Sequence, residues 1–202
     1  MVTMSKQTSK LNALKNRYYV MRHGQSLANV QGLIVSQPEN GLNSYGLSET
    51  GRQQVKAAIG HGSLDPSTRI ICSDFKRTRE TAILVHYLLA CDQDLELDSR
   101  LRERNFGELE LGSDDGYAGV WVADQSGGEV EYRAVESVSS VLERSVAVIL
   151  DLEQQFENQQ CLLIAHGDIL QILQTAFSDL PAYRHRDLPH LDTAELRLLN
   201  DL

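Results

Sequence analysis

An arginine and a histidine directly follow the first apolar segment of this 202-residue chain, in the sequence YVMRHGQSLAN. A second histidine ends another apolar segment, CLLIAHG, and both histidines, His23 and His166, precede a glycine. Arginine offers phosphate oxygens a planar fork of N–H donors, and a neutral imidazole can attack phosphorus to form a phosphohistidine. A glycine after each histidine lets the backbone approach a phosphate closely. These residue types therefore favour phosphoryl chemistry.

Two other chemistries fit the sequence less well. A metal site would need three or four ligands, and the chain has neither an H-x-H or H-E-x-x-H pattern nor a cluster of cysteines and histidines. A serine hydrolase of the nucleophile-elbow type would need G-x-S-x-G, which is absent. Phosphoryl transfer remains the preferred interpretation.

The elements that must position these side chains alternate along the chain. Apolar segments predict strands, and segments with apolar residues every three or four positions predict helices. The first predicted helix, 46–60, has Ser48 as its N-cap. Such alternation predicts an α/β sheet that helices cover on both faces. The predicted strands are 17–21, 68–73, 94–98, 161–167 and 193–199, and the predicted helices are 46–60, 74–90, 130–156 and 168–177.

Three of the predicted strands end in polar residues that suit catalysis. In such sheets, ligands bind beyond the carboxyl ends of the strands. We therefore expect the residues at these ends to share one site. The ends are Arg22-His23-Gly24, Ser73-Asp74 leading into Lys76-Arg77, and His166-Gly167.

Five segments in the same order resemble the histidine phosphatase superfamily, which includes the cofactor-dependent phosphoglycerate mutases. The resemblance covers about Tyr18 to Leu199. It implies a phosphoglycerate mutase-like fold, which is a three-layer α/β/α sandwich with a mostly parallel sheet and an antiparallel edge strand. The segments are RHGQSLAN, LSETGRQQ, CSDFKRTRETA, LRERNFGELE and LLIAHGD.

The resemblance also implies a role for each matching residue. His23 would be the phosphorylated nucleophile, and Glu103 would protonate the leaving oxygen and then activate water. Glu103 also fits an exposed, salt-bridged run of charges. Ser26 and Asn29, two of the candidates for phosphate binding, also fit a helix cap. No metal or cofactor is implied. The residues that would hold the phosphoryl group are Arg22, Arg77 and His166, with further phosphate contacts from Ser26, Asn29 and Gly167.

The chain departs from the family pattern at two places. Asp168 follows the second His-Gly pair, where many relatives carry a neutral residue. Its carboxylate would either lie near the phosphate and tune specificity or cap the next helix, and we expect the cap. The insertion at about 107–133 would be a loop or a small cap, and it is acidic, with Arg133 as its single arginine. Mutases of this family use a basic cap to bind a phosphoglycerate carboxylate, so the acidic cap favours a phosphatase.

The preferred function is therefore a metal-independent phosphatase that acts on a small phosphomonoester. The alternatives are a mutase, a protein phosphohistidine or phosphoprotein phosphatase, and a non-catalytic regulatory module on the same fold. A module of that kind would normally have lost one of the two arginines or two histidines, and all four are present. No feature of the sequence specifies the substrate or the oligomeric state.

Composition limits the partners and the cellular compartment expected for this protein. The formal net charge of −9 disfavours nucleic acid as a partner. Three cysteines without C-x-x-C spacing, Cys72, Cys91 and Cys161, favour buried, reduced thiols in a cytoplasmic protein. No apolar run is long enough to span a membrane, and the polar residues 1–16 are expected to form a flexible tail before a single domain over 17–202.

Overall fold

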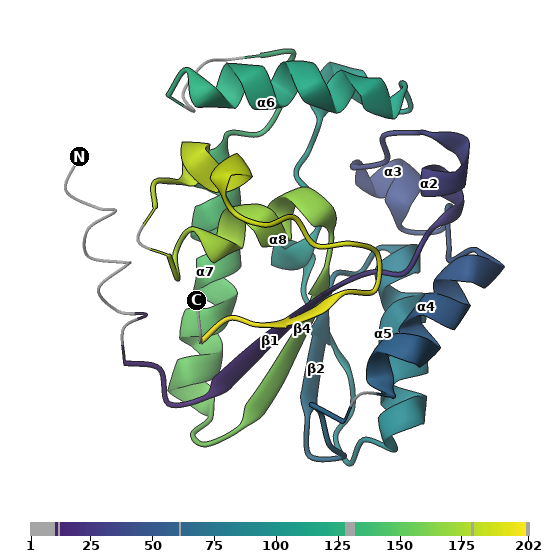
Figure 1. Cartoon of the computed structure of the whole chain (residues 1–202), viewed down its shortest axis with the longest axis vertical. Helices are drawn as coiled ribbons and strands as arrows, with labels where there is room; N and C mark the ends of the chain where they lie inside the picture. Colours follow the sequence, from purple (N-terminus) through teal and green to yellow (C-terminus); the bar gives the residue numbers. More distant parts are fainter. Residues whose placement is uncertain (1–10, 12, 61, 128–131, 179, 201–202) are drawn as a thin grey trace.

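The structure is a computed structural model that describes residues 11, 13–60, 62–127, 132–178 and 180–200. Within these residues a five-stranded sheet has the order β3-β2-β4-β1-β5 (Figure 1). The first four strands along the chain are parallel, and β5 pairs antiparallel with β1 at the edge. The strands are β1 (Arg17–Arg22), β2 (Arg69–Cys72), β3 (Glu96–Leu97), β4 (Gln160–Ala165) and β5 (Leu196–Leu198).

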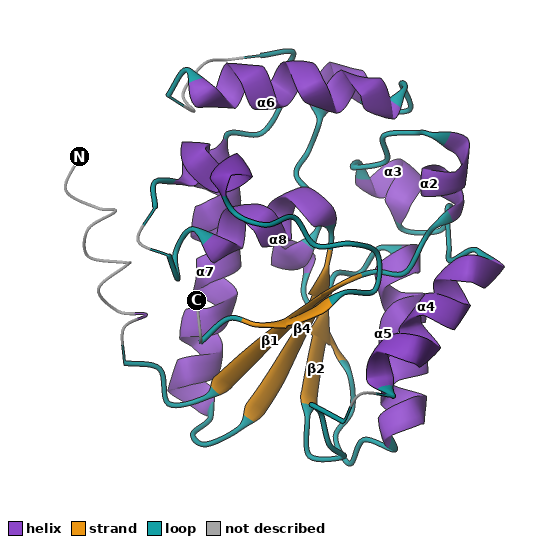
Figure 2. Ribbon diagram, in the orientation of Figure 1, coloured by secondary structure: helices purple, strands orange, loops and turns teal. Residues whose placement is uncertain are grey.

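Helices cover both faces of the sheet (Figure 2). On one face lie α7 (Val138–Gln155) and α8 (Gly167–Gln174), and on the other lie α4 (Glu49–Ile59) and α5 (Lys76–Leu89). This arrangement confirms the predicted three-layer sandwich with a mostly parallel sheet and an antiparallel edge strand.

The central strands are apolar throughout because both of their faces are buried. In β1, Tyr18 and Val20 belong to the core on the α7 side, and Tyr19 and Met21 belong to the core on the α4 and α5 side. Alternate residues of a strand point to opposite faces, so a continuous apolar run serves two cores at once.

The described part of the insertion forms a cap above the carboxyl ends of the strands. It contains α6 (Tyr117–Gln125), which Figure 1 shows above the rest of the molecule, so this part is largely helical and not a loop. Two short helices, α2 (Leu27–Gln31) and α3 (Pro38–Gly41), lie beside it. Short 3-10 helices complete the chain at Ser99–Leu101 (η1), Gly107–Leu109 (η2), Asp114–Gly116 (η3) and Ala182–Asp187 (η4).

Two predicted helices differ from the structure. The helix expected over 130–156 begins at Val138, because the Ser137 hydroxyl accepts a hydrogen bond from the Ser140 amide and caps it there; residues 130–131 lie outside the described residues. In α5, the helix predicted over 74–90, the apolar residue Ile83 is 58% exposed. The buried face of α5 consists of Arg77, which reaches into the site, and of four small side chains that allow close packing against α4 and the sheet: Thr78, Thr81, Ala82 and Val85.

The predicted tail over 1–16 is described only at its end, since residues 1–10 and 12 lie outside the described residues. Leu11 is buried in the core on the α7 side, and the Asn16 side chain donates a hydrogen bond to Glu153 at 2.8 Å. The last residues of this segment are therefore packed against the domain. Of the cysteines, Cys72 and Cys161 are buried and Cys91 is half-buried, and all three are free thiols. None of the helices in the described ranges has both the length and the apolar character that crossing a bilayer requires.

Candidate active site

The sheet register brings the three predicted strand ends to one edge. Met21 of β1 and Cys72 of β2 both pair with Ile164 of β4, so the residues that follow them lie side by side. The backbone continues this alignment, because the His23 amide donates to the Ala165 carbonyl at 3.0 Å. The sheet thus positions His23 next to His166, with 5.2 Å between their ring centroids.

Hydrogen bonds assign the proton of each imidazole. Arg77 Nε donates to His23 Nε2 at 3.1 Å and to His166 Nδ1 at 3.2 Å, so both of these nitrogens carry a lone pair. The opposite nitrogens carry the hydrogens, because His23 Nδ1 donates to the Gly24 carbonyl at 2.8 Å and His166 Nε2 donates to the Ser73 hydroxyl at 2.9 Å. Burial, reinforced by the Arg77 charge, holds the pKa of both histidines well below the usual value. Both rings are therefore neutral near pH 7, and the lone pair on His23 Nε2 is a nucleophile.

Arg77 is the central cation of the site. It lies in the first turn of α5, is 4% exposed, and donates through one terminal nitrogen to the Val35 carbonyl at 2.8 Å. Burial lowers its pKa to about 10, which still leaves it charged at neutral pH. Its Nη1 is buried and has no hydrogen-bond partner among the described residues. A buried guanidinium nitrogen without a partner is a donor available to an anionic ligand.

Arg22 supplies a second cation from the end of β1. Its Nη1 donates to His190 Nε2 at 2.8 Å and to the Leu191 carbonyl at 3.0 Å. Its Nε is buried and has no partner within the described part of the chain. His190 comes from the YRHRDLPH segment, and it accepts this hydrogen bond as a neutral imidazole. Burial and the neighbouring Arg22 charge lower the pKa of His190, which agrees with that state.

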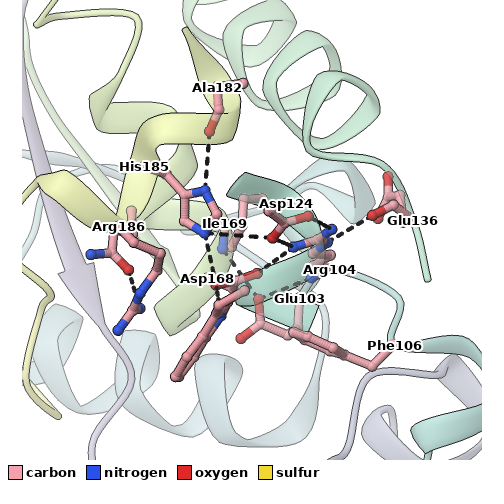
Figure 3. A network of polar contacts seen from close by, with 12 residues as sticks. Glu103, Arg104, Phe106, Asp124, Glu136, Asp168, Ile169, Ala182, His185 and Arg186 are labelled. Carbon is pink, nitrogen blue, oxygen red and sulfur yellow. Dashed lines mark hydrogen bonds and ion pairs between the residues drawn. The ribbon is translucent and has the colours of Figure 1, made fainter. Parts of the chain in front are cut away.

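Glu103 lies at the same edge, just after η1. Its Oε1 accepts hydrogen bonds from the Arg104 amide at 2.9 Å and the Ile169 amide at 3.2 Å (Figure 3). Desolvation raises the pKa of this carboxyl, and the charge of Asp168 raises it further. A carboxyl group with a raised pKa can carry a proton for a general acid, so the structure does not support the alternative in which Glu103 belongs to an exposed run of charges.

The remaining candidates have clear local roles. Ser26 and Asn29 form a capping box at the start of α2, in which the Ser26 hydroxyl accepts from the Asn29 amide at 3.2 Å and Asn29 Oδ1 accepts from the Ser26 amide at 3.0 Å. The side chain of Ser26 is thereby used within α2. A Cβ atom on Gly167 would lie 3.2 Å from His190 Cε1 and 3.4 Å from Arg22 Cζ, which explains the need for glycine beside the arginine.

The prediction for Asp168 was wrong. The N-cap of α8 is His166, and the carboxylate of Asp168 turns instead toward the cap, where it accepts hydrogen bonds from Arg104 Nη1 at 3.1 Å and Trp121 Nε1 at 3.0 Å. Its long-range ion pair with Arg104 outweighs the local capping role. Ser73, which contacts His166, belongs to one of the strand ends expected at the site. His190, which contacts Arg22, was not among the predicted site residues; its place in a polar segment before the last strand was the available signal.

No group of three or more histidine, cysteine, aspartate or glutamate side chains within the described ranges is arranged to hold a metal ion. The two buried donors at the site, Arg22 Nε and Arg77 Nη1, instead suit an anion. The arrangement combines a neutral nucleophile, two cations and a carboxyl group whose pKa is raised, and these groups together can transfer a phosphoryl group.

Comparison with known proteins agrees with this chemistry. A family model described as "Histidine phosphatase superfamily (branch 1)" matches residues 18–200. The chain is 31% identical over 175 residues to "Probable phosphoglycerate mutase GpmB" of Escherichia coli O1:K1 / APEC, covering 84% of this chain and 78% of that protein. Among solved structures, it is similar to mycobacterial glucosyl-3-phosphoglycerate phosphatase, with a TM-score of 0.73 and 25% identity over 89% of this chain and 87% of that one. A structure named "Mycobacterial hydrolase 1" gives a TM-score of 0.75 at 25% identity, covering 91% of this chain and 87% of that one.

Proposed function

The chain belongs to the histidine phosphatase superfamily, and from that premise we propose that it hydrolyses a small phosphomonoester through a phosphohistidine on His23, without a metal ion. The observation that carries this proposal is the tautomer of His23. Its Nδ1 hydrogen is donated to the Gly24 carbonyl, and its Nε2 lone pair faces Arg77, the cation that would hold the phosphoryl oxygens.

The proposed first step transfers the phosphoryl group to the enzyme. Phosphate oxygens bind Arg22 Nε and Arg77 Nη1, and Arg77 exchanges its contact with His23 for a contact with the substrate. His23 Nε2 then attacks phosphorus as the ester P–O bond breaks. Glu103 gives its proton to the leaving oxygen, so the substrate departs as a neutral alcohol.

The proposed second step returns the enzyme to its starting state. The Glu103 carboxylate takes a proton from water, the water oxygen attacks phosphorus, and the N–P bond breaks to release inorganic phosphate. His166 and the two arginines stabilise the charge on the phosphoryl oxygens in both steps. Ser26, Asn29 and the amide of Gly167 are proposed as further phosphate contacts. For Ser26 and Asn29 this proposal requires that the phosphate compete with the capping box.

Phosphoglycerate mutase activity is the second candidate, because the Escherichia coli relative described above is named a probable phosphoglycerate mutase. The composition of the cap favours hydrolysis. Its sequence has Arg133 as the single arginine among many acidic residues, and these would repel the carboxylate of a phosphoglycerate. The free thiols further support a reducing compartment, and we propose the cytoplasm.

Turnover across a panel of phosphorylated sugars, acids, nucleotides and phosphopeptides tests this proposal. We expect release of inorganic phosphate from at least one small phosphomonoester, and no turnover by His23→Ala. Isomerisation of 3-phosphoglycerate faster than phosphate release from any panel compound would favour the mutase. Preferential hydrolysis of the phosphopeptides would favour a protein phosphatase.

A further inference from the structure

A group of polar and charged residues, most of them buried, lies beside Glu103 and includes two residues of the cap helix α6 (Figure 3). We call it the Arg104 cluster, and its members are Arg104, Trp121, Asp124, Asp168 and His185. Arg104 donates to both oxygens of Asp124 at 2.7 and 2.8 Å and to Asp168 at 3.1 Å. The side chains of Arg104, Asp124 and Asp168 are 3%, 6% and 5% exposed. Buried charges are costly to maintain unless they are paired, and the proposed mechanism uses none of these side chains directly.

The cluster joins three elements that are far apart in the sequence. Asp124 and Trp121 belong to α6, Asp168 belongs to the first turn of α8, and His185 lies in η4. Trp121 Nε1 donates to Asp168 Oδ1 at 3.0 Å, and His185 Nε2 lies 3.6 Å from the same oxygen. Asp168 is thus the point at which the cap and the C-terminal segment meet α8, the helix that His166 precedes as its N-cap.

The backbone at Arg104 and the backbone just after Asp168 also hold the Glu103 carboxyl group. Its Oε1 accepts from the amides of Arg104 and Ile169, which are the chain neighbours of Glu103 and Asp168 respectively (Figure 3). The ion pair between Arg104 and Asp168 therefore clamps the two amides that orient this carboxyl. Among the described residues no hydrogen bond reaches Glu103 Oε2, so this oxygen is the one able to carry a transferable proton.

The charge of Asp168 also affects the pKa of Glu103. Burial raises the pKa of Asp168, but the adjacent His185 imidazole and the Arg104 charge outweigh burial and hold that pKa below its usual value. A carboxylate that stays ionised beside a second carboxyl favours the protonated form of the second one. The Asp168 charge accordingly raises the pKa of Glu103, next in size to desolvation.

Other charged groups also face Glu103. Arg77 on α5 and Arg22 on β1 attract its carboxylate form, and the Tyr117 hydroxyl approaches from α6. On α7, Arg144 Nη2 donates to the Glu103 carbonyl, but Nε and Nη2 of this arginine also donate to the carboxylate of Glu136. Two cations would favour an ionised Glu103, which could not act as a general acid. A nearby negative charge is needed to oppose them.

We propose that Asp168 is a positioning residue for the general acid: its carboxylate, held by Arg104 and Trp121, keeps Glu103 oriented and protonated until the leaving oxygen takes the proton. This inference rests on the proposed function. Asp168 itself is not the acid, because both of its oxygens accept hydrogen bonds within the cluster and it carries no proton to transfer.

The test compares Asp168→Asn with the matched control Asp124→Asn. Each variant removes one buried negative charge from Arg104, but only Asp168 acts on Glu103. The pH dependence of kcat/KM is measured on an alkyl phosphate and on p-nitrophenyl phosphate. Ionisation of the substrate is common to both enzymes, so it cancels from the ratio of wild-type to variant activity.

For Asp168→Asn on the alkyl phosphate, we expect the alkaline limb to move to lower pH. The ratio of wild-type to variant activity should therefore rise with pH and then level off. On p-nitrophenyl phosphate, whose leaving group needs little protonation, the rise should be much smaller. Asp124→Asn should keep the alkaline limb of the wild type. A ratio that does not change with pH, or an equal shift in Asp124→Asn, would overturn the role of Asp168.

The test also distinguishes variants that do not fold from failure of the proposed function. If Asp168→Asn does not fold, the paired variant Arg104→Gln/Asp168→Asn removes both partners of the ion pair. It should show a smaller shift in the same direction, because the Arg104 cation is lost together with the Asp168 charge. Failure of both variants to fold would make Asp168 a folding requirement and overturn the positioning role. Failure of the proposed function would appear separately, because the wild type would then show no phosphatase turnover and no alkaline limb at all.

Discussion

Replacing Glu103 with glutamine should separate proton transfer from phosphate binding. The glutamine oxygen can keep both hydrogen bonds that Oε1 accepts, from the Arg104 amide at 2.9 Å and the Ile169 amide at 3.2 Å. The amide nitrogen then takes the place of Oε2, the oxygen that would carry the proton. Shape and local hydrogen bonds are preserved, and only the transferable proton is lost.

The size of the effect follows from this isosteric replacement. General acid catalysis typically contributes about 10²–10⁴-fold, which corresponds to about 2.7–5.4 kcal/mol of transition-state stabilisation at about 1.36 kcal/mol per tenfold change in rate. We expect a loss of this size in kcat/KM on an alkyl phosphate. On p-nitrophenyl phosphate the loss should be much smaller, because the leaving phenolate needs little protonation.

Steady-state kinetics on both substrates, with the two enzymes compared at one pH, measures this difference. His23→Ala is the matched comparison, since it removes the nucleophile and should be severely impaired on both substrates. An equal loss on the two substrates for Glu103→Gln, or full activity on the alkyl phosphate, would refute the role of Glu103 as the general acid.

Three further predictions concern metal, packing and pH. Phosphate release should survive an excess of chelator, and activity lost with EDTA and restored by a divalent ion would contradict the mechanism. A Cβ atom on Gly51 would lie 2.1 Å from the Gln25 carbonyl oxygen, in the loop that follows His23. Gly51→Ala should therefore lower kcat, and it should lower the free energy of unfolding by about 1–3 kcal/mol. The control is Gly60→Ala, whose added Cβ meets only ordinary contacts in a helical conformation and should change the free energy of unfolding by less than about 0.5 kcal/mol. Because the pKa values of His23 and His166 are lowered in the folded state, the unfolded chain binds more protons below about pH 6.5. Urea unfolding should therefore show that stability falls as pH drops from 7 toward 5.5, and that it falls less steeply in His23→Ala; identical slopes would contradict the neutral state assigned to His23.

The sequence predicts the sheet and the strand ends well, because these depend on local patterns. Apolar runs that are buried on both faces read as strands, and Arg22 and His23 directly follow one of them. The long helix predicted from apolar residues at every third or fourth position is also confirmed as α7, whose Val141, Ile149 and Leu152 are buried. Local sequence was less informative about the start of α7, because apolar residues recur before Ser137 without forming a helix.

The helix of the cap and the contacts of Asp168 could not be predicted in this way. The helix α6 contains Gly119 and buries only Val120 and Asp124, so it lacks the apolar stripe by which a helix is normally recognised. Contacts such as the bond from Trp121 to Asp168, which are distant in the sequence, hold it in place. The pairing of Asp168 with Arg104 spans 64 residues, and nothing in the local pattern around either residue indicates it.

The most direct test of the central claim is to trap the covalent intermediate. Wild-type enzyme mixed with a turned-over substrate and rapidly quenched should contain a phosphoryl group that is labile in acid and stable in base, as a phosphohistidine is. Mapping should place this group on His23, whose Nε2 lone pair faces Arg77 at 3.1 Å. A phosphate on Ser26 or Cys72, or turnover by His23→Ala at the wild-type rate, would contradict the account.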